Sequence, residues 1–144
     1  MLIGIQASGK STFYKENFFN SHLRISNDLL KTKNREKLLL EYCKITQTPF
    51  VIDNTNITKT VRFKYISIIK QMDCKIIGYY FKTNINQSME WNKNRNGKEC
   101  IPDVGILGTY KKLEIPTLDE GFDILYYVEA STGNFVIKEW NNEI

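Results

Sequence analysis

The chain has 144 residues, which fits one compact domain with a core that needs neither disulfides nor a structural metal. Hydrophobic residues make up 42% and charged residues 25%, with both signs dispersed, so the composition excludes a disordered chain. The net charge of +4 is mildly basic and by itself does not distinguish a nucleic-acid-binding surface from an ordinary solvated one.

Cysteine and histidine usage excludes two further kinds of site. The three cysteines are far apart and His22 is the only histidine, so we expect neither a zinc site nor a catalytic Cys–His pair. We interpret the cysteines as reduced thiols of a cytoplasmic protein. No apolar run approaches the roughly 20 residues of a membrane span, and we expect no signal peptide and no membrane partner.

The first half of the chain predicts strands that alternate with helices. Short apolar runs predict strands at residues 1–3, 23–26 and 50–53. Only three residues precede Gly4, which is short for a central strand. The sequence leaves open whether the strand is truncated or the protein starts earlier, and the short strand bears on stability more than on chemistry. Helical periodicity predicts helices over residues 10–19, 29–45 and 59–72.

The second half continues the alternation and ends differently. A β-rich run predicts a strand at 75–81, followed by helices at 86–95 and from Pro102 to about 113, with a turn at Asn96-Gly97 between them. Strands at 124–129 and 135–139 flank Thr132-Gly133-Asn134, which indicates a C-terminal hairpin. The whole pattern predicts an α/β fold with a mainly parallel sheet flanked by helices.

Residues 4–11 read GIQASGKS, a complete phosphate-binding P-loop between a strand and a helix. Its glycines permit a tight loop, and the helix directs its positive dipole end at the phosphates. Lys10 is predicted to reach the β- and γ-phosphates of ATP and Ser11 to ligate Mg²⁺. We expect ATP to contact the loop and first helical turn at Gly4, Ala7, Ser8, Gly9, Lys10, Ser11 and Thr12. With the strand–helix alternation, the motif predicts a P-loop NTPase or kinase fold.

Acidic residues follow the next two predicted strands, at the sheet edge where α/β proteins bind ligands. Asp28 faces the γ-phosphate side of such a fold, where it is a candidate base for an attacking hydroxyl. The alternative is a helix N-cap, and spacing alone does not decide between the two. Asp53 opens the polar run 53–56 and is a candidate ligand of Mg²⁺ or its waters, which we favour over a simple Asx-turn.

Taken in order, these segments resemble the kinase domain of 5′-hydroxyl polynucleotide kinases, both the phage enzyme and the kinase half of the animal DNA-repair enzyme. The resemblance runs from residue 4 to about residue 122. Besides the P-loop, Asp28 and residues 52–56, it includes Arg62, Asn92–Arg95 and Ile101-Pro102. The most specific match is residues 110–122, which read YKKLEIPTLDEGF.

The resemblance implies roles for several residues. Asp28 would be the general base that activates the acceptor 5′-hydroxyl. Arg95 would lie in a lid over about residues 90–102 and stabilise the transferring charge beside Lys10. Asp53 would organise the metal shell together with Asn56. Contacts to the substrate would come from Lys31, Asn56, Arg62 and Lys93. For Arg62 the alternative is that it helps to hold the site rather than a substrate phosphate.

Three positions depart from the family pattern. Asn27 and Trp91 stand where arginine is found in the family or its phage member, and Lys31 replaces an arginine with a point charge that lacks the bidentate fork. We expect no phosphatase domain beside this one, so removal of a 3′-phosphate is not implied. Basic residues nevertheless cluster at 31–37, in the lid, and at Lys111-Lys112, where a phosphate backbone would be attracted.

Our leading hypothesis is a single domain, 1–144, that transfers the γ-phosphate of ATP to a 5′-hydroxyl of DNA or RNA with Mg²⁺. The departures keep two alternatives open: a P-loop kinase acting on a small-molecule hydroxyl, and a non-catalytic nucleotide-dependent binding module. The sequence leaves open the choice between DNA and RNA and the oligomeric state.

Overall fold

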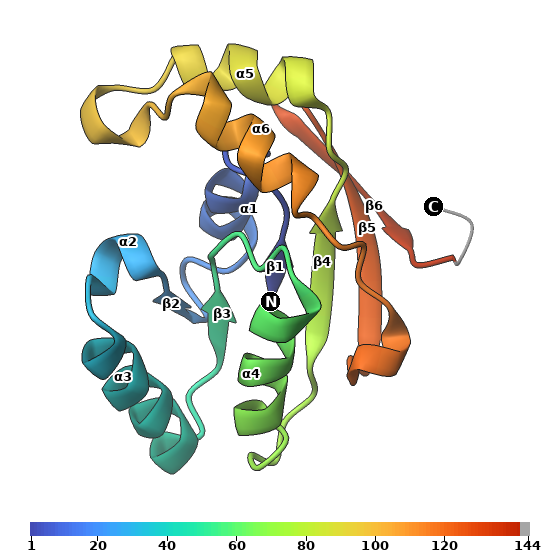
Figure 1. Ribbon diagram of the computed structural model, residues 1–144. Coiled ribbons are helices and arrows are strands. Elements are labelled where there is room, and N and C mark those ends of the chain that lie inside the picture. Colours follow the sequence, from blue (N-terminus) through green and yellow to red (C-terminus); the bar gives the residue numbers. More distant parts are fainter. Residues whose placement is uncertain (142–144) are drawn as a thin grey trace.

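A mainly parallel sheet forms the frame of the molecule in the computed structural model, which describes residues 1–141 apart from the side chain of Lys98 (Figure 1). Its strands are β1 (Leu2–Ile3), β2 (Leu23–Ile25), β3 (Phe50–Ile52), β4 (Ile77–Phe81), β5 (Ile124–Ser131) and β6 (Asn134–Glu139). Strands β1-β4-β5-β6 form one sheet and β2-β3 a second, and only β6 runs antiparallel to its neighbour. A parallel bridge between Leu2 and Asp53 places β3 beside β1. The predicted α/β architecture is confirmed.

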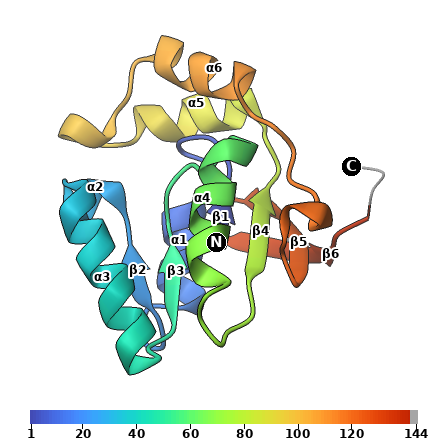
Figure 2. The ribbon, with the colours of Figure 1, turned by 60° about the horizontal axis from the view of Figure 1, so that its bottom comes forward.

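Helices cover both faces of the sheet and one of its ends. They are α1 (Lys10–Asn17), α2 (Asn27–Leu30), α3 (Lys33–Thr46), α4 (Lys59–Ile69), α5 (Ile85–Lys93) and α6 (Asp103–Lys111), with 3-10 turns η1 (Gly97–Glu99) and η2 (Leu118–Glu120). Figures 1 and 2 show α5 and α6 lying across the end of the sheet to which β4 points. In the described residues, no helix has the length and apolar character needed to cross a bilayer.

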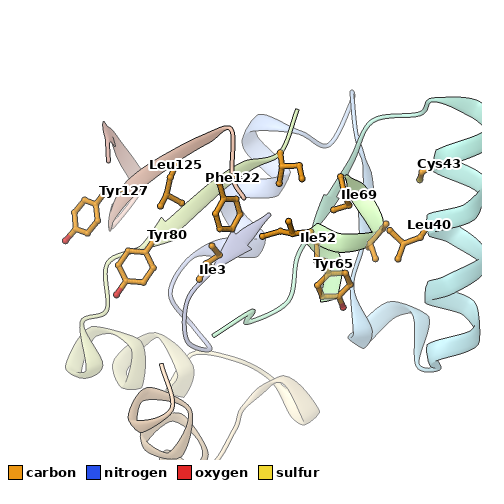
Figure 3. Close-up of a cluster of buried hydrophobic side chains, with 13 residues drawn as sticks. Ile3, Leu40, Cys43, Ile52, Tyr65, Ile69, Tyr80, Phe122, Leu125 and Tyr127 are labelled. Carbon is orange, nitrogen blue, oxygen red and sulfur yellow. The ribbon is translucent and has the colours of Figure 1, made fainter. Parts of the chain in front are cut away.

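Alternating strand side chains divide the core into two layers. Ile3, Ile52 and Tyr80 belong to a cluster that also contains buried side chains of α3 and α4 (Figure 3). Their chain neighbours Leu2, Val51 and Phe81 belong to the opposite cluster, with Phe13 and Tyr14 of α1. Because successive strand residues point to opposite faces, a strand as short as β1 still contributes to both layers.

The helix expected at 29–45 is in fact two helices. Helix α2 ends at Leu30, because the next residue, Lys31, has a left-handed φ of 65° that stops helical hydrogen bonding. Thr32 then accepts a hydrogen bond from the Arg35 amide at 3.3 Å and begins α3 as its N-cap. The break corrects the prediction of a continuous helix. The apolar periodicity continues across residues 29–45, so it does not reveal that Thr32 caps a new helix.

The predicted C-terminal hairpin is confirmed, and it packs on the P-loop side of the sheet. Ser131 pairs with Asn134 across a two-residue turn in which Gly133 has a φ of 76°. Just beyond the turn, the ring of Phe135 lies 5.1 Å from that of Phe13 in α1, centroid to centroid. The hairpin thus closes the sheet with an antiparallel strand and supports the helix that follows the P-loop.

A cavity of about 420 Å³ lies at the end of β1 opposite the P-loop. Its walls include Met1, Phe50 of β3 and Ile77 of β4, and it extends to α3 and α4 at Cys43 and Ile69. Met1 and Leu2 line it at the start of β1, beside the first residues of β3 and β4.

Arg62 is the largest fully buried side chain of the described chain, and it joins α4 to the segment before β5. Its Nε and one terminal nitrogen donate to the two carboxylate oxygens of Glu120 at 2.6 and 2.8 Å. The other terminal nitrogen donates to the carbonyls of Asn56 and Glu114 at 3.1 and 3.0 Å. All three nitrogens of the guanidinium therefore donate hydrogen bonds within the protein.

Replacing Arg62 with alanine should lower the free energy of unfolding by about 3–5 kcal/mol, because it leaves the Glu120 carboxylate buried without its partner. Urea denaturation measures the change. Lys64→Ala, on the exposed face of the same helix, is the matched control and should change stability by less than about 0.5 kcal/mol. A loss at Arg62 no larger than that of the control would contradict the structural role.

Candidate nucleotide-binding site

The P-loop leaves β1 at the edge of the sheet and ends in the first turn of α1. Gly9 is the N-cap residue, with a left-handed φ of 93°, and no side chain caps the helix. The amides of the first turn, at Lys10, Ser11 and Thr12, therefore remain free to bind an anion, and the helix dipole favours one there. A Cβ on Gly9 would lie 3.1 Å from the ring of Phe135, so the hairpin adds a second reason for glycine.

Lys10 lies folded inside the loop. Its ammonium donates to the carbonyl of Ile5 and, at 3.2 Å, to the hydroxyl of Ser8, which itself donates to the Ile5 carbonyl at 2.9 Å. Burial lowers the pKa of Lys10 to about 8; the Asp53 carboxylate opposes this shift and the positive charge of Arg95 adds to it. Lys10 is therefore mostly charged at pH 7, at the centre of the loop.

Ser11 and Asp53, the predicted metal ligands, are in contact. The Ser11 hydroxyl donates to Oδ2 of Asp53 at 3.0 Å, and the Asp53 carboxylate is almost fully buried at the end of β3. Asp53 does not cap the next helix, because the N-cap of α4 is Thr58, whose hydroxyl accepts a hydrogen bond from the Val61 amide. Hydroxyl and carboxylate oxygens are ligands that Mg²⁺ accepts, with phosphates and waters completing its shell. The side chains thus fit a magnesium ion that is bound together with a nucleotide.

The described chain has no group of three or more His, Cys, Asp or Glu side chains able to hold a metal ion by themselves.

Arg24 is a member of this cluster that the sequence reasoning missed. Its Nε donates to Oδ2 of Asp53 at 2.8 Å, and a terminal nitrogen donates to the Ser11 hydroxyl at 3.0 Å. The guanidinium also lies over the Tyr14 ring, 5.7 Å from its centroid. The signal in the sequence was its position between the apolar residues Leu23 and Ile25 of a predicted strand. Because strand side chains alternate, Arg24 lies on the opposite face of the sheet from both neighbours.

Asp28 is exposed in the first turn of α2, and Ser26 occupies the N-cap position. The alternative that Asp28 is itself the N-cap is therefore wrong. The preceding amide, of Asn27, donates to Oδ1 of Asn54 at 2.8 Å. This contact ties the start of α2 to the loop that carries Asp53, so Asp28 and Asp53 belong to the same edge of the sheet.

The predicted lid corresponds to the end of α5, η1 and the start of α6 (Figure 2). Asn92 closes its base by donating to the Ile101 carbonyl at 2.6 Å and accepting from the Ile101 amide at 3.0 Å. Gln6 of the P-loop donates to the Thr109 hydroxyl of α6 at 2.9 Å. Arg95 is half-buried, and its positive charge contributes least among the causes that shift the pKa of Lys10.

The four residues expected to contact the substrate fall into two groups. Lys31 and Lys93 are exposed. Asn56 and Arg62 are 1% and 0% exposed, and the Asn56 amide donates to the Leu2 carbonyl at 2.7 Å. We therefore revise the expectation for Asn56 and Arg62, because neither side chain reaches solvent and both make contacts that hold the fold.

The affinity for ATP should fall as the pH rises through about 8, because the Lys10 ammonium is charged below that pH and loses its proton above it. We expect an association constant roughly tenfold lower at pH 9 than at pH 7. Fluorescence titration with an ATP analogue at constant ionic strength measures it. Lys10→Met should bind weakly at both values, and a flat profile in the unaltered protein would contradict the assignment.

Comparison with known proteins agrees with this geometry. No protein-family model matches the chain. A bifunctional polynucleotide phosphatase/kinase of Schizosaccharomyces pombe is 28% identical over 127 residues, which cover 85% of this chain but only 31% of that protein. A gluconokinase from Sinorhizobium meliloti 1021 superposes with a TM-score of 0.59 at 16% identity, over 89% of this chain and 79% of the gluconokinase chain. The chain thus has the fold of a P-loop kinase and is kinase-like in sequence.

Proposed function

We propose that the chain is an ATP- and Mg²⁺-dependent kinase that phosphorylates a 5′-hydroxyl of DNA or RNA. The observation that carries the proposal is the gathering of donor and acceptor groups at one sheet edge: Lys10 and Ser11 on the P-loop, Asp53 in contact with Ser11, and Asp28 on the adjoining segment. The similarity to a polynucleotide phosphatase/kinase, which spans most of this chain, supports a polynucleotide as the acceptor.

The donor phosphates would lie against the first turn of α1. Free amides of that turn and the Lys10 ammonium would bind their oxygens, while Ser11 and Asp53 would hold Mg²⁺. When bound, Mg²⁺ neutralises the charge that develops on the donor oxygens. Arg95, half-buried in the lid and close enough to act on Lys10, would stabilise the transferring phosphoryl group from the opposite side.

Asp28 would act on the acceptor. Its exposed carboxylate would take the proton of the 5′-hydroxyl while the hydroxyl oxygen forms a bond to the γ-phosphorus and ADP leaves. Such a positioned base contributes on the order of 10²–10⁴ in rate. Asn27, which precedes it, is fixed by Asn54, so the segment that carries the base is attached to the segment that carries Asp53.

Exposed basic side chains suit a polyanionic acceptor. Lys31 lies at the left-handed turn between α2 and α3, three residues beyond Asp28, and Lys93 lies at the end of α5, two residues before Arg95. Both would attract the phosphates that flank a 5′-terminal nucleotide, without reading its sequence.

A small-molecule hydroxyl is the second candidate acceptor, because the solved gluconokinase shares this fold. The two acceptors differ in charge and therefore in salt dependence. Binding of a polynucleotide releases counterions and weakens steeply as salt rises, whereas a small acceptor with one charge or none shows a much smaller slope. A non-catalytic nucleotide-dependent module would bind ATP and phosphorylate neither.

Transfer of label from γ-labelled ATP tests the choice of acceptor. With Mg²⁺, we expect labelling of 5′-hydroxyl DNA or RNA oligonucleotides, with rates at limiting oligonucleotide that fall several-fold between about 50 and 200 mM salt. Gluconate is the parallel acceptor. Labelling of gluconate without labelling of either oligonucleotide would contradict the proposal, and so would ATP binding with no transfer to any acceptor.

Replacing Asp28 with alanine or asparagine should reduce transfer by about 10²–10⁴-fold and leave ATP affinity and thermal stability unchanged, since the side chain is exposed. Asp73→Asn, at another exposed aspartate, is the matched control and should retain activity. Equal activity of the Asp28 and Asp73 variants would show that Asp28 is not the base.

A further inference from the structure

The guanidinium of Arg24 occupies the same oxygens that a magnesium ion at this P-loop would use. Oδ2 of Asp53 accepts from the Ser11 hydroxyl at 3.0 Å and from Nε of Arg24 at 2.8 Å, and a terminal nitrogen of Arg24 lies 2.7 Å away. The Ser11 oxygen, in turn, accepts from Arg24 at 3.0 Å. A single side chain therefore bridges both expected metal ligands.

A divalent cation and this guanidinium cannot use the site together without cost. The Ser11 hydroxyl has two lone pairs, one of which accepts from Arg24, and Oδ2 of Asp53 already faces three donor nitrogens or hydroxyls. The Asp53 side chain is 2% exposed, so water screens the repulsion between the two positive charges poorly. Either cation satisfies the carboxylate, and each disfavours the other.

Arg24 has room to move away from these oxygens, because its side chain is 25% exposed whereas that of Asp53 is 2% exposed. Rotation about the side-chain bonds moves the guanidinium away from Ser11 and Asp53 without moving β2, whose backbone pairs with β3.

We propose that Arg24 and Mg²⁺ compete for Ser11 and Asp53, so that Arg24 sets the Mg²⁺ concentration at which the protein binds a metal–nucleotide complex. The inference rests on the magnesium site of the proposed function, and concerns a residue that takes no part in the transfer itself. With the guanidinium in place, Asp53 is neutralised without metal; with it withdrawn, the two oxygens are free for the cation.

The test measures binding of a fluorescent ADP analogue as Mg²⁺ is titrated, with the unaltered protein and with Arg24→Ala. Every protein is titrated at the same nucleotide concentration, so that free nucleotide binds the same amount of Mg²⁺ in each titration. We expect the Mg²⁺ midpoint of Arg24→Ala to fall by roughly tenfold, because a like charge beside the metal is removed. Arg24→Lys keeps the charge without the fork and should give an intermediate midpoint. Arg35→Ala, at an exposed arginine of α3, should leave the midpoint unchanged.

Circular dichroism and thermal melting show whether each variant folds, and Arg24→Gln replaces Arg24→Ala if alanine does not. An unchanged or higher midpoint in the folded neutral variant would overturn the inference, because Arg24 would then be indifferent to the metal or required for it. Nucleotide binding that ignores Mg²⁺ in all variants would also overturn it.

No acceptor is present in this titration, so its result is independent of the proposed acceptor. A lowered midpoint combined with no labelling of DNA or RNA would support the competition and reject polynucleotide phosphorylation. An unchanged midpoint combined with labelling would do the reverse.

Discussion

The junction between β1 and the loop after β3 is the constraint on which the rest of the molecule depends. Strand β1 has two residues, so it cannot join the sheets by strand pairing alone. A single parallel bridge links Leu2 to Asp53, the Gly4 amide donates to the Thr55 carbonyl at 2.9 Å, and the buried Asn56 amide donates to the Leu2 carbonyl. The same short stretch then places Asp53 on Ser11. The contacts that join the sheets therefore also bring the P-loop and its acidic partner together.

Several positively charged side chains lie around this junction and would favour an anionic ligand. Lys10 is buried in the loop, Arg24 bridges Ser11 and Asp53, and Arg95 is near enough to lower the pKa of Lys10. Only Asp53 opposes them at close range in the cluster described here. Triphosphate oxygens would balance these cations, whereas the identity of the acceptor depends on exposed residues at the rim, such as Asp28 and Lys31, which the fold alone does not restrict.

Local chemistry explains which features could be predicted from the sequence. The P-loop, the order of strands and helices and the terminal hairpin follow from patterns of neighbouring residues, and the structure has them. The role of Arg24 and the burial of Arg62 depend on distant contacts: Arg24 lies 29 residues from Asp53 and Arg62 lies 58 residues from Glu120 in sequence. The break at Lys31 is local, since Thr32 caps α3 through the Arg35 amide. A charged side chain looks the same in a sequence whether it binds a substrate or closes a buried ion pair, so the sequence alone does not separate the two roles considered for Arg62.

The central claim is that one sheet edge holds a phosphate donor against an acceptor hydroxyl. A crystal structure with an ATP analogue, Mg²⁺ and a 5′-hydroxyl oligonucleotide tests it most directly. We predict that the phosphates lie on the first turn of α1 beside Lys10, that Arg24 has left Ser11 and Asp53, and that the Asp28 carboxylate is within hydrogen-bonding distance of the 5′-hydroxyl, in line with the γ-phosphorus. An acceptor bound away from Asp28, or a nucleotide bound away from the P-loop, would contradict it.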